Sequence, residues 1–161
     1  MKAEAVIRKL ATEGKTLATA ESCTGGLLGA LLTEVAGASR VYLGGVVSYA
    51  YSVKESLLGV DSALLAEKGA VCEEVALQMA EGVRRTLGAD YALSVTGNAG
   101  PGTDEKNPRV GEIFVACADA AGSRCLCLWC EGNRQENRLT ACEAAFSLIL
   151  REEGSGVDDC L

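Results

Sequence analysis

The fold is decided by residues 16–35, which read TLATAESCTGGLLGALLTEV. Residues 16–20 have the short apolar pattern of a strand, and residues 25–35 form an apolar run typical of a helix. Between them lies AESCTGG, residues 20–26, which joins the strand to the helix. Because ligands of open α/β sheets bind where strands end and helices begin, this junction is a candidate ligand-binding or catalytic site.

The alternation of strands and helices continues outward from this unit. Periodicity predicts helices at 2–13, 52–58, 62–67, 73–87 and 135–152, and strands at 41–49, 91–95, 112–118 and 123–131. The run 41–49 is expected to be a buried strand, and the last two strands form a hairpin. Residues 97–111 hold both prolines and are expected to be a long functional loop. The pattern predicts an α/β domain over residues 1–153, with a largely parallel sheet and one antiparallel strand, followed by a flexible tail at 154–161.

Composition favours one soluble domain and excludes several classes of enzyme. The 161 residues are 48% hydrophobic and 23% charged, as in ordinary globular proteins. The absence of histidine excludes Ser-His-Asp hydrolases, Cys-His proteases and His-ligated zinc hydrolases. The net charge of −7 disfavours a nucleic-acid partner. No charge-free run could span a bilayer and no secretory leader is expected, so no membrane partner is predicted and the cytoplasm is the expected location.

The eight cysteines are predicted to be reduced packing residues. Cys127 and Cys130 form the only C-x-x-C pair, whereas a zinc ribbon needs two. A thioredoxin-like pair should open a helix, but this one lies in a predicted strand. The sequence therefore predicts no metal site.

AESCTGG is the first of three polar segments expected at one edge of the sheet. Backbone N–H groups at a helix start attract anions and developing oxyanions, and glycines let a ligand approach the backbone. Ser22 would lie at the rim of these groups. The alternative is that Ser22 or Thr24 simply caps the helix. A dinucleotide-binding fingerprint is disfavoured because Thr24 stands where the first glycine is required.

The second and third segments follow the neighbouring strands. SYAYSVK, residues 48–54, places Tyr49 and Lys54 after the strand at 41–49. A partly desolvated lysine beside a serine can act as its base, and a tyrosine can relay the proton. Thr96 precedes the glycine-rich loop that contains Gly97 and Gly100. The alternatives are a surface lysine, core tyrosines and a simple turn.

Taken together, these segments resemble the CinA C-terminal domain family, which includes the nicotinamide-nucleotide amidohydrolases. The resemblance covers residues 3 to 152, and AESCTGG is its most distinctive part. The other matching motifs are GVVSY (45–49) with Lys54, LLGV (57–60), KGAV (68–71), TGNAGP (96–101), P-x-V-G (108–111), and G-x-R (132–134) with Arg138. The resemblance implies a three-layer α/β/α sandwich with a mixed, mostly parallel sheet. It also implies hydrolysis of nicotinamide mononucleotide to nicotinate mononucleotide and ammonia.

The resemblance also assigns roles to residues. Ser22 corresponds to the nucleophile, supported by Lys54, Tyr49 and Thr96. The predicted substrate-binding residues are Cys23, Thr24, Gly25, Gly26, Gly97, Ala99, Gly100, Arg134 and Arg138, with the two arginines placed near the substrate phosphate. No cofactor and no metal is expected, and the partner is a small-molecule pyridine mononucleotide.

Three departures from the family pattern leave the function open. Tyr51 stands where the family usually has Asn, Asn98 replaces the usual apolar residue after Thr-Gly, and the segment 102–107 lacks the customary second glycine. Tyr51 could fill or reshape the pocket. The alternative functions are a non-catalytic nucleotide-binding or regulatory module, and another amidase or esterase that uses the same Ser-Lys pair. A homo-oligomer is possible on the sequence alone.

Overall fold

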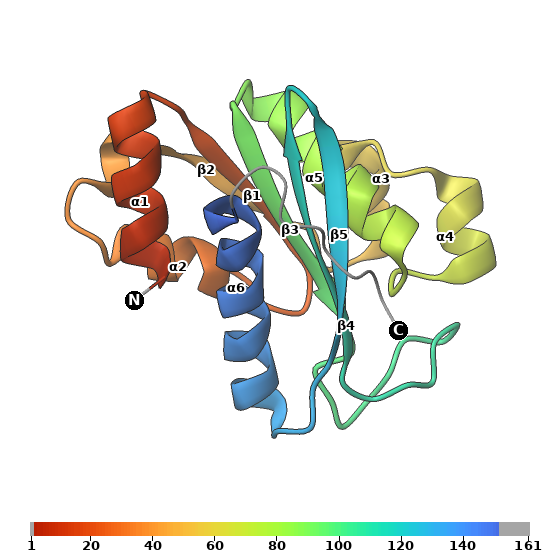
Figure 1. Ribbon diagram of the computed structural model, residues 1–161. Coiled ribbons are helices and arrows are strands. Elements are labelled where there is room, and N and C mark those ends of the chain that lie inside the picture. The colour runs from red at the N-terminus through yellow and green to blue at the C-terminus, as the bar shows by residue number, and fades with distance from the viewer. Residues whose placement is uncertain (1, 152–161) are drawn as a thin grey trace.

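A five-stranded sheet with the order β2-β1-β3-β4-β5 forms the centre of the chain. The computed structural model describes residues 2–151 (Figure 1). The strands are β1 (Leu17–Glu21), β2 (Tyr42–Val47), β3 (Tyr91–Gly97), β4 (Glu112–Asp119) and β5 (Gly122–Trp129). The helices are α1 (Lys2–Glu13), α2 (Leu27–Thr33), the 3₁₀ turn η1 (Ala38–Arg40), α3 (Tyr51–Leu58), α4 (Ser62–Lys68), α5 (Glu73–Leu87) and α6 (Arg134–Leu150).

The direction of the strands confirms the predicted mixed sheet. β1 pairs in parallel with both β2 and β3, while β4 is antiparallel to both β3 and β5. In the sheet of residues 2–151, β4 therefore runs against the other four strands. The carboxyl ends of β2, β1 and β3 lie side by side, which brings the segments that follow them to one edge.

Helices cover both faces of the sheet, so the fold is the predicted α/β/α sandwich (Figure 1). One apolar core joins the sheet to α1, α2 and α6, with Leu10, Leu28 and Phe146 fully buried in it. The opposite core joins the sheet to α3, α4 and α5, with Leu58 and Met79 buried. The α5 prediction at 73–87 matches the observed helix.

The prediction of a buried strand at 41–49 was wrong. β2 lies at the end of the strand order and pairs only with β1 in the described sheet. Its burial alternates, and Leu43 and Val47 are each 50% exposed. An edge strand has one unpaired side and is less covered by helices, so β-branched and apolar residues alone do not establish burial.

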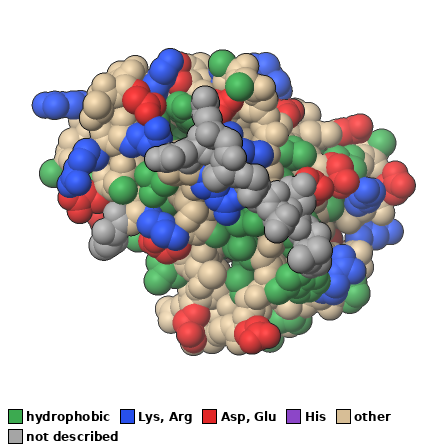
Figure 2. Space-filling view, in the orientation of Figure 1, with side chains coloured by type: hydrophobic (Ala, Val, Ile, Leu, Met, Phe, Trp, Pro, Cys, Tyr) green, Lys and Arg blue, Asp and Glu red, His purple; other side chains and the backbone are tan. Residues whose placement is uncertain are grey.

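Two further features bear on the sequence predictions. No helix within residues 2–151 is long and apolar enough to cross a membrane. Figure 2 shows acidic and basic side chains interspersed over the face it presents. The predicted tail at 154–161 lies outside the described residues.

Candidate active site

Parallel pairing brings the three predicted polar segments together. Glu21, the last residue of β1, pairs with Val47 of β2 on one side and Val95 of β3 on the other. The residues that follow these positions are Ser22, Ser48 and Thr96. Three neighbouring strand ends thus deliver hydroxyl side chains to the same edge of the sheet.

Lys54 reaches this edge from the middle of α3 and contacts Ser22. Its side chain is fully buried at 0% exposure, and its Nζ lies 2.9 Å from Ser22 Oγ. Nζ also donates to the backbone carbonyl oxygens of Ser48 and Tyr49, the second at 3.1 Å. Ser22 is itself buried, at 8% exposure. Lys54 is therefore a buried side chain fixed by hydrogen bonds beside Ser22, and not a solvated surface lysine.

The environment of Lys54 increases the share of its neutral form. Loss of hydration on burial lowers the pKa of the ammonium from 10.5 to about 8. A neutral amine has two N–H donors and one lone pair. As an ammonium, Lys54 donates its third N–H to Ser22 Oγ. When the amine is neutral and its two N–H groups donate to the carbonyls of Ser48 and Tyr49, the lone pair is left for the Ser22 hydroxyl. The geometry can thus accept a proton from Ser22 and activate its oxygen.

The cysteine next to Ser22 is not a competing nucleophile. Burial raises the pKa of the Cys23 thiol to about 12. At neutral pH the thiol therefore stays protonated, and the thiolate is the reactive form of cysteine. The Ser22 hydroxyl, by contrast, has the Lys54 amine within hydrogen-bond distance.

The start of α2 is capped by Glu21 and not by Ser22 or Thr24. The N-cap residue is Gly26, whose φ is 110°, and no side chain caps it in the standard way. The buried Glu21 carboxylate instead accepts hydrogen bonds from Leu28 N at 2.8 Å and Gly29 N at 3.1 Å. These helix N–H groups are therefore already satisfied and cannot bind a ligand.

Because Glu21 occupies the N–H groups of Leu28 and Gly29, fewer backbone N–H groups are free to bind an oxyanion than the sequence suggested. Among the hydrogen bonds of residues 2–151, the N–H groups of Cys23, Thr24 and Gly26 donate to no other residue. The hydroxyl of Thr24 is also buried without a partner among the described residues. The predicted oxyanion donors are thus restricted to the turn before α2.

Loss of the Glu21 carboxylate is expected to destabilise the fold. Glu21→Gln places an amide N–H₂ against backbone donors, so we expect the free energy of unfolding in urea to fall by about 2 kcal/mol. Glu55→Gln is the matched control, because Glu55 is exposed on α3 and should change stability by less than about 0.5 kcal/mol. Equal effects of the two substitutions would contradict the capping role of Glu21.

A cavity of about 320 Å³ opens beside Ser22. Its lining residues are Ser22, Cys23, Tyr49, Tyr51, Ala70, Val71, Thr96, Gly97, Asn98, Ala99, Gly102, Thr103, Asp104 and Arg134. Of the predicted binding residues, Thr24, Gly25, Gly26, Gly100 and Arg138 are not among them. Thr96 faces the cavity while its hydroxyl donates to the Ala70 carbonyl at 2.8 Å, so it holds the segment between α4 and α5.

Tyr49 contacts Lys54 through its backbone and not through its phenol. Tyr49 is 66% exposed. Within residues 2–151, no hydrogen bond joins the phenol to Ser22 or Lys54. The proton relay through this phenol, which the sequence suggested, has no contact to support it. Tyr49 nevertheless lines the cavity.

The two predicted arginines have different surroundings. Arg134 lines the cavity and donates to the Gly100 carbonyl at 2.8 Å. Arg138 donates to the carbonyls of Cys23 and Thr24, at 3.0 and 2.7 Å. Arg138 therefore holds the AESCTGG turn in place, and of the two arginines only Arg134 lines the cavity.

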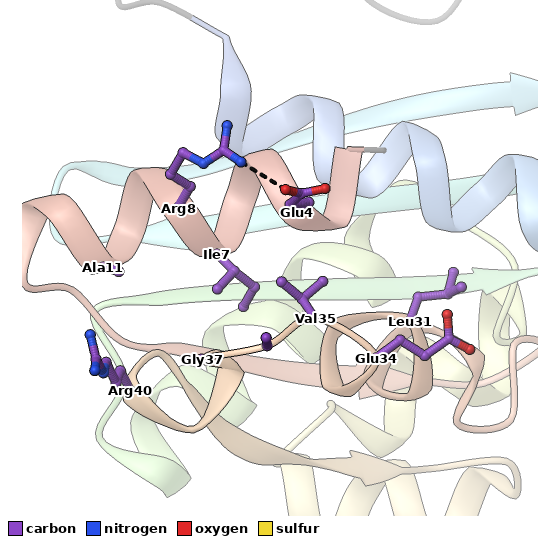
Figure 3. Close-up of a pocket in the computed structure, with 10 residues that line it drawn as sticks. Glu4, Ile7, Arg8, Ala11, Leu31, Glu34, Val35, Gly37 and Arg40 are labelled. Carbon is purple, nitrogen blue, oxygen red and sulfur yellow. Dashed lines mark hydrogen bonds and ion pairs between the residues drawn. The ribbon is translucent and has the colours of Figure 1, made fainter.

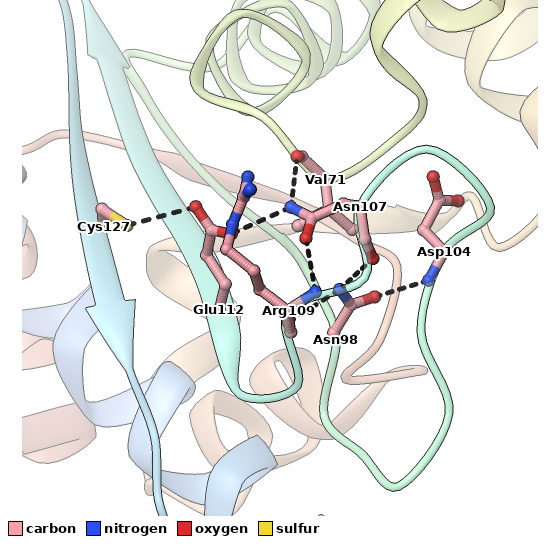
Figure 4. A network of polar contacts seen from close by, with 7 residues as sticks. All are labelled: Val71, Asn98, Asp104, Asn107, Arg109, Glu112 and Cys127. Atoms are coloured by element: carbon pink, nitrogen blue, oxygen red, sulfur yellow. Dashed lines mark hydrogen bonds and ion pairs between the residues drawn. The ribbon is translucent and has the colours of Figure 1, made fainter.

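A polar network shapes the loop that forms one side of the cavity (Figure 4). Asn98 Nδ2 donates to the carbonyls of Asn107 and Arg109, each at 3.0 Å. Asn107 Nδ2 donates to the Val71 carbonyl at 3.1 Å and to the Glu112 carboxylate at 3.0 Å. Arg109 also pairs with Glu112. These bonds explain how a 15-residue segment at 97–111 stays ordered against the sheet.

A larger cavity of about 440 Å³ lies elsewhere, between α1 and the segment 31–40 (Figure 3). Ile7, Leu31 and Val35 give it an apolar lining, and a Glu4–Arg8 ion pair lies on α1 beside it. Its lining contains no serine, lysine or tyrosine. In the described part of the chain, no three His, Cys, Asp or Glu side chains could hold a metal ion. The candidate chemistry therefore belongs to the cavity beside Ser22.

The geometry agrees with the relationship of the chain to known proteins. Residues 1–152 match the family model of the CinA C-terminal domain. The chain belongs to this family. A CinA-like protein of Geobacter sulfurreducens is 46% identical over 147 residues, which are 91% of this chain and 36% of the relative. A CinA-like protein of Anaeromyxobacter dehalogenans is 47% identical over 146 residues, which are 89% of this chain and 35% of the relative. The chain spans about a third of the length of these curated relatives.

Solved structures of the CinA superfamily have the same fold. The competence/damage inducible protein CihA of Agrobacterium tumefaciens is 36% identical with a TM-score of 0.84, over 93% of this chain and 94% of the other. The CinA superfamily protein of Escherichia coli is 28% identical with a TM-score of 0.89, over 92% of this chain and 87% of the other. The family and fold predicted from the sequence are thereby confirmed.

Sequence reasoning missed several polar residues that position the site of this CinA domain. Glu21 lies inside the distinctive motif, but its role as a helix cap was not foreseen. Asn137 donates to the Ala99 carbonyl at 3.0 Å and so holds the glycine-rich loop. One available signal was the capping box at the start of α6, where Asn133 and Glu136 satisfy each other's backbone N–H groups. That motif fixes where α6 begins, and hence where Asn137 and Arg138 lie.

Proposed function

We propose that the chain deamidates nicotinamide mononucleotide to nicotinate mononucleotide and ammonia, with Ser22 as the nucleophile and Lys54 as its base. The observation that carries the proposal is the buried Lys54 amine, 2.9 Å from Ser22 Oγ and held by two carbonyls. A serine–lysine pair is a known replacement for histidine in acyl transfer. The chain contains no histidine that could do this work.

The first half of the reaction forms an acyl-enzyme. Neutral Lys54 accepts the Ser22 proton as Oγ bonds to the carboxamide carbon, and the carbonyl electrons move onto oxygen. Backbone N–H groups of the turn 23–26 are the candidate donors to this oxyanion, a contribution of roughly 3 kcal/mol per donor in other enzymes. The carbonyl then re-forms, the C–N bond breaks, and Lys54 returns its proton so that the nitrogen leaves as ammonia.

The second half restores the enzyme. Lys54, again neutral, accepts a proton from water as the water oxygen bonds to the acyl carbon. Breakage of the ester bond transfers that proton to Ser22 Oγ and releases the product as a carboxylic acid, which loses its remaining proton to solvent to give the nicotinate carboxylate. Arg134, which lines the cavity, supplies a cation for the anionic part of the mononucleotide.

A non-catalytic pyridine-nucleotide-binding or regulatory module is the second candidate. It is favoured by Tyr51 and Asp104, which both line the cavity and belong to segments that depart from the family pattern. A third reading keeps the Ser22–Lys54 pair but changes the substrate to another small amide or ester.

An assay of ammonia release separates these functions. We expect the purified chain to release one ammonia for each nicotinamide mononucleotide consumed, with saturation kinetics, because the proposal assigns the nucleophile to Ser22 and the base to Lys54. Calorimetric titration of the same ligand runs in parallel. Binding without ammonia release would select the module, and turnover only of other amides in a substrate screen would select the third reading.

A further inference from the structure

Tyr51 and Asp104 connect the two walls of the cavity beside Ser22. The Tyr51 phenol donates to Asp104 Oδ1 at 2.6 Å. Tyr51 is the first residue of α3, three positions before Lys54 on the same helix. Asp104 belongs to the loop at 98–111, and both residues line the cavity. One hydrogen bond therefore links the helix that carries the proposed base to the loop that lines the same cavity.

Asp104 is held on its loop side by Asn98. The backbone N–H of Asp104 donates to Asn98 Oδ1 at 2.8 Å (Figure 4). Asn98 directly follows β3, and its backbone N–H donates to the Glu112 carbonyl at 2.9 Å. The sheet, Asn98, Asp104 and Tyr51 thus form a continuous chain of contacts to α3. A hydrogen bond to a charged acceptor is stronger than one between neutral groups.

Gly69 gives Asp104 the room to reach Tyr51. A Cβ atom at this position would lie 2.2 Å from Asp104 Oδ2 and 2.8 Å from Lys106 Cβ. The φ of Gly69 is +75°, which other residues rarely adopt. The close approach of the loop to the end of α4 therefore depends on glycine at position 69. Substitution of Gly69 can displace Asp104 without changing Tyr51 or Asp104, the two hydrogen-bonding residues.

We propose that the Tyr51–Asp104 hydrogen bond is a latch that holds the loop 98–111 in place as the cavity wall facing Ser22, so that Tyr51 and Asp104 are positioning residues for ligand binding. Neither residue hydrogen-bonds to the Ser22 hydroxyl or the Lys54 amine in the described structure, although the charge of the Asp104 carboxylate acts through space to raise the pKa of Lys54. Release of the latch moves the wall and leaves the Ser22–Lys54 contact in place. The latch is thus expected to act chiefly on ligand affinity, with only a small effect on the chemical step through the charge of Asp104. Only this kinetic consequence rests on the proposed function.

The first test needs no catalytic activity. Amide hydrogen exchange of the full chain is measured for wild type, Tyr51→Phe and Gly69→Ala, with Tyr91→Phe as the matched control. Loss of a charge-assisted hydrogen bond is expected to speed exchange of amides in 98–107 by about tenfold in Tyr51→Phe. Gly69→Ala should do the same, and Tyr91→Phe should not. Retained protection in the amides of β3 and α5 shows that each variant is folded.

The double variant tests whether both substitutions act on one contact. Because either change opens the same latch, Tyr51→Phe combined with Gly69→Ala should exchange no faster than the faster single variant. Unchanged exchange of the loop in Tyr51→Phe overturns the proposal. Multiplied effects in the double variant overturn it as well, since the two residues would then hold the loop independently.

The second test separates binding from chemistry. For nicotinamide mononucleotide we expect Tyr51→Phe to raise KM by about tenfold and to change kcat by less than about twofold. A fall in kcat with an unchanged KM would contradict a positioning role. If the wild-type chain releases no ammonia, the proposed function fails, and the exchange experiment decides the latch by itself.

Discussion

Replacement of Ser22 by alanine is expected to lower kcat/KM for nicotinamide mononucleotide by at least about 10³-fold. The substitution removes the oxygen that would form the acyl-enzyme bond, and no other hydroxyl lies within hydrogen-bond distance of Lys54 Nζ among the described residues. Binding of the substrate should persist, because the cavity wall and Arg134 are unchanged. Steady-state kinetics and calorimetry on the same preparation measure both quantities.

Ser94→Ala is the matched control for this substitution. Ser94 is also a buried serine, on β3, but its hydroxyl donates to the Ala76 carbonyl at 2.6 Å and lies outside the cavity lining. Its loss should reduce stability by about 1 kcal/mol and leave turnover within about twofold of wild type. Turnover by Ser22→Ala near the level of Ser94→Ala would show that the nucleophile is elsewhere.

The part of the site made by strand order could be predicted from the sequence. Ser22, Lys54 and Thr96 each follow a predicted strand, and parallel neighbours bring their carboxyl ends to one edge whatever the details of packing. The distinctive motif AESCTGG marked one of these ends. What periodicity could not give was which atoms touch, since the backbone carbonyl of Tyr49, and not its phenol, contacts Lys54.

The parts that escaped prediction depend on long-range contacts between polar groups. Arg138 donates to the carbonyls of Cys23 and Thr24, which are more than 100 residues away in the sequence. A pair of arginines at the start of a helix does not indicate which distant carbonyl groups they will bind. Tyr51 and Asp104 show the same limit. Tyr51 and the segment 102–107, which holds Asp104, depart from the family pattern separately, and only the fold shows that Tyr51 and Asp104 form one hydrogen bond. Local patterns predict elements well because they reflect burial, whereas side-chain pairing reflects tertiary geometry.

Substitution of Lys54 is expected to remove activity for a different reason, through loss of the base. Both Lys54→Met and Lys54→Arg should lower kcat/KM by about 10³-fold, a typical contribution of acid–base catalysis. Methionine has no proton acceptor. Arginine keeps a cation near Ser22, but its guanidinium stays protonated and cannot accept the serine proton. The arginine variant therefore separates the need for a base from the need for a positive charge.

The pH dependence of kcat/KM for the wild-type chain should reflect the ionisation of Lys54. With a pKa of about 8 for Lys54, roughly a tenth of the amine is neutral at pH 7, about 300 times more than for an unperturbed lysine. Log kcat/KM is then expected to rise by one for each pH unit below about 8 and to level off above it. A profile that is flat between pH 7 and 9, or an active Lys54→Arg variant, would argue against Lys54 as the base.

The lowered pKa of Lys54 also makes a prediction about stability that does not depend on any substrate. Burial lowers the pKa from 10.5 in the unfolded chain to about 8 in the folded one, so between these values the unfolded chain binds more protons. Stability must then increase with pH across this window, and the cost of burying the ammonium is fully present below it. The unfolding free energy of wild type, compared with Lys54→Met, should gain roughly 3 kcal/mol between pH 7.5 and 10.5. A constant difference across this range would mean that Lys54 stays charged when folded, and a charged amine has no lone pair with which to take the proton of Ser22.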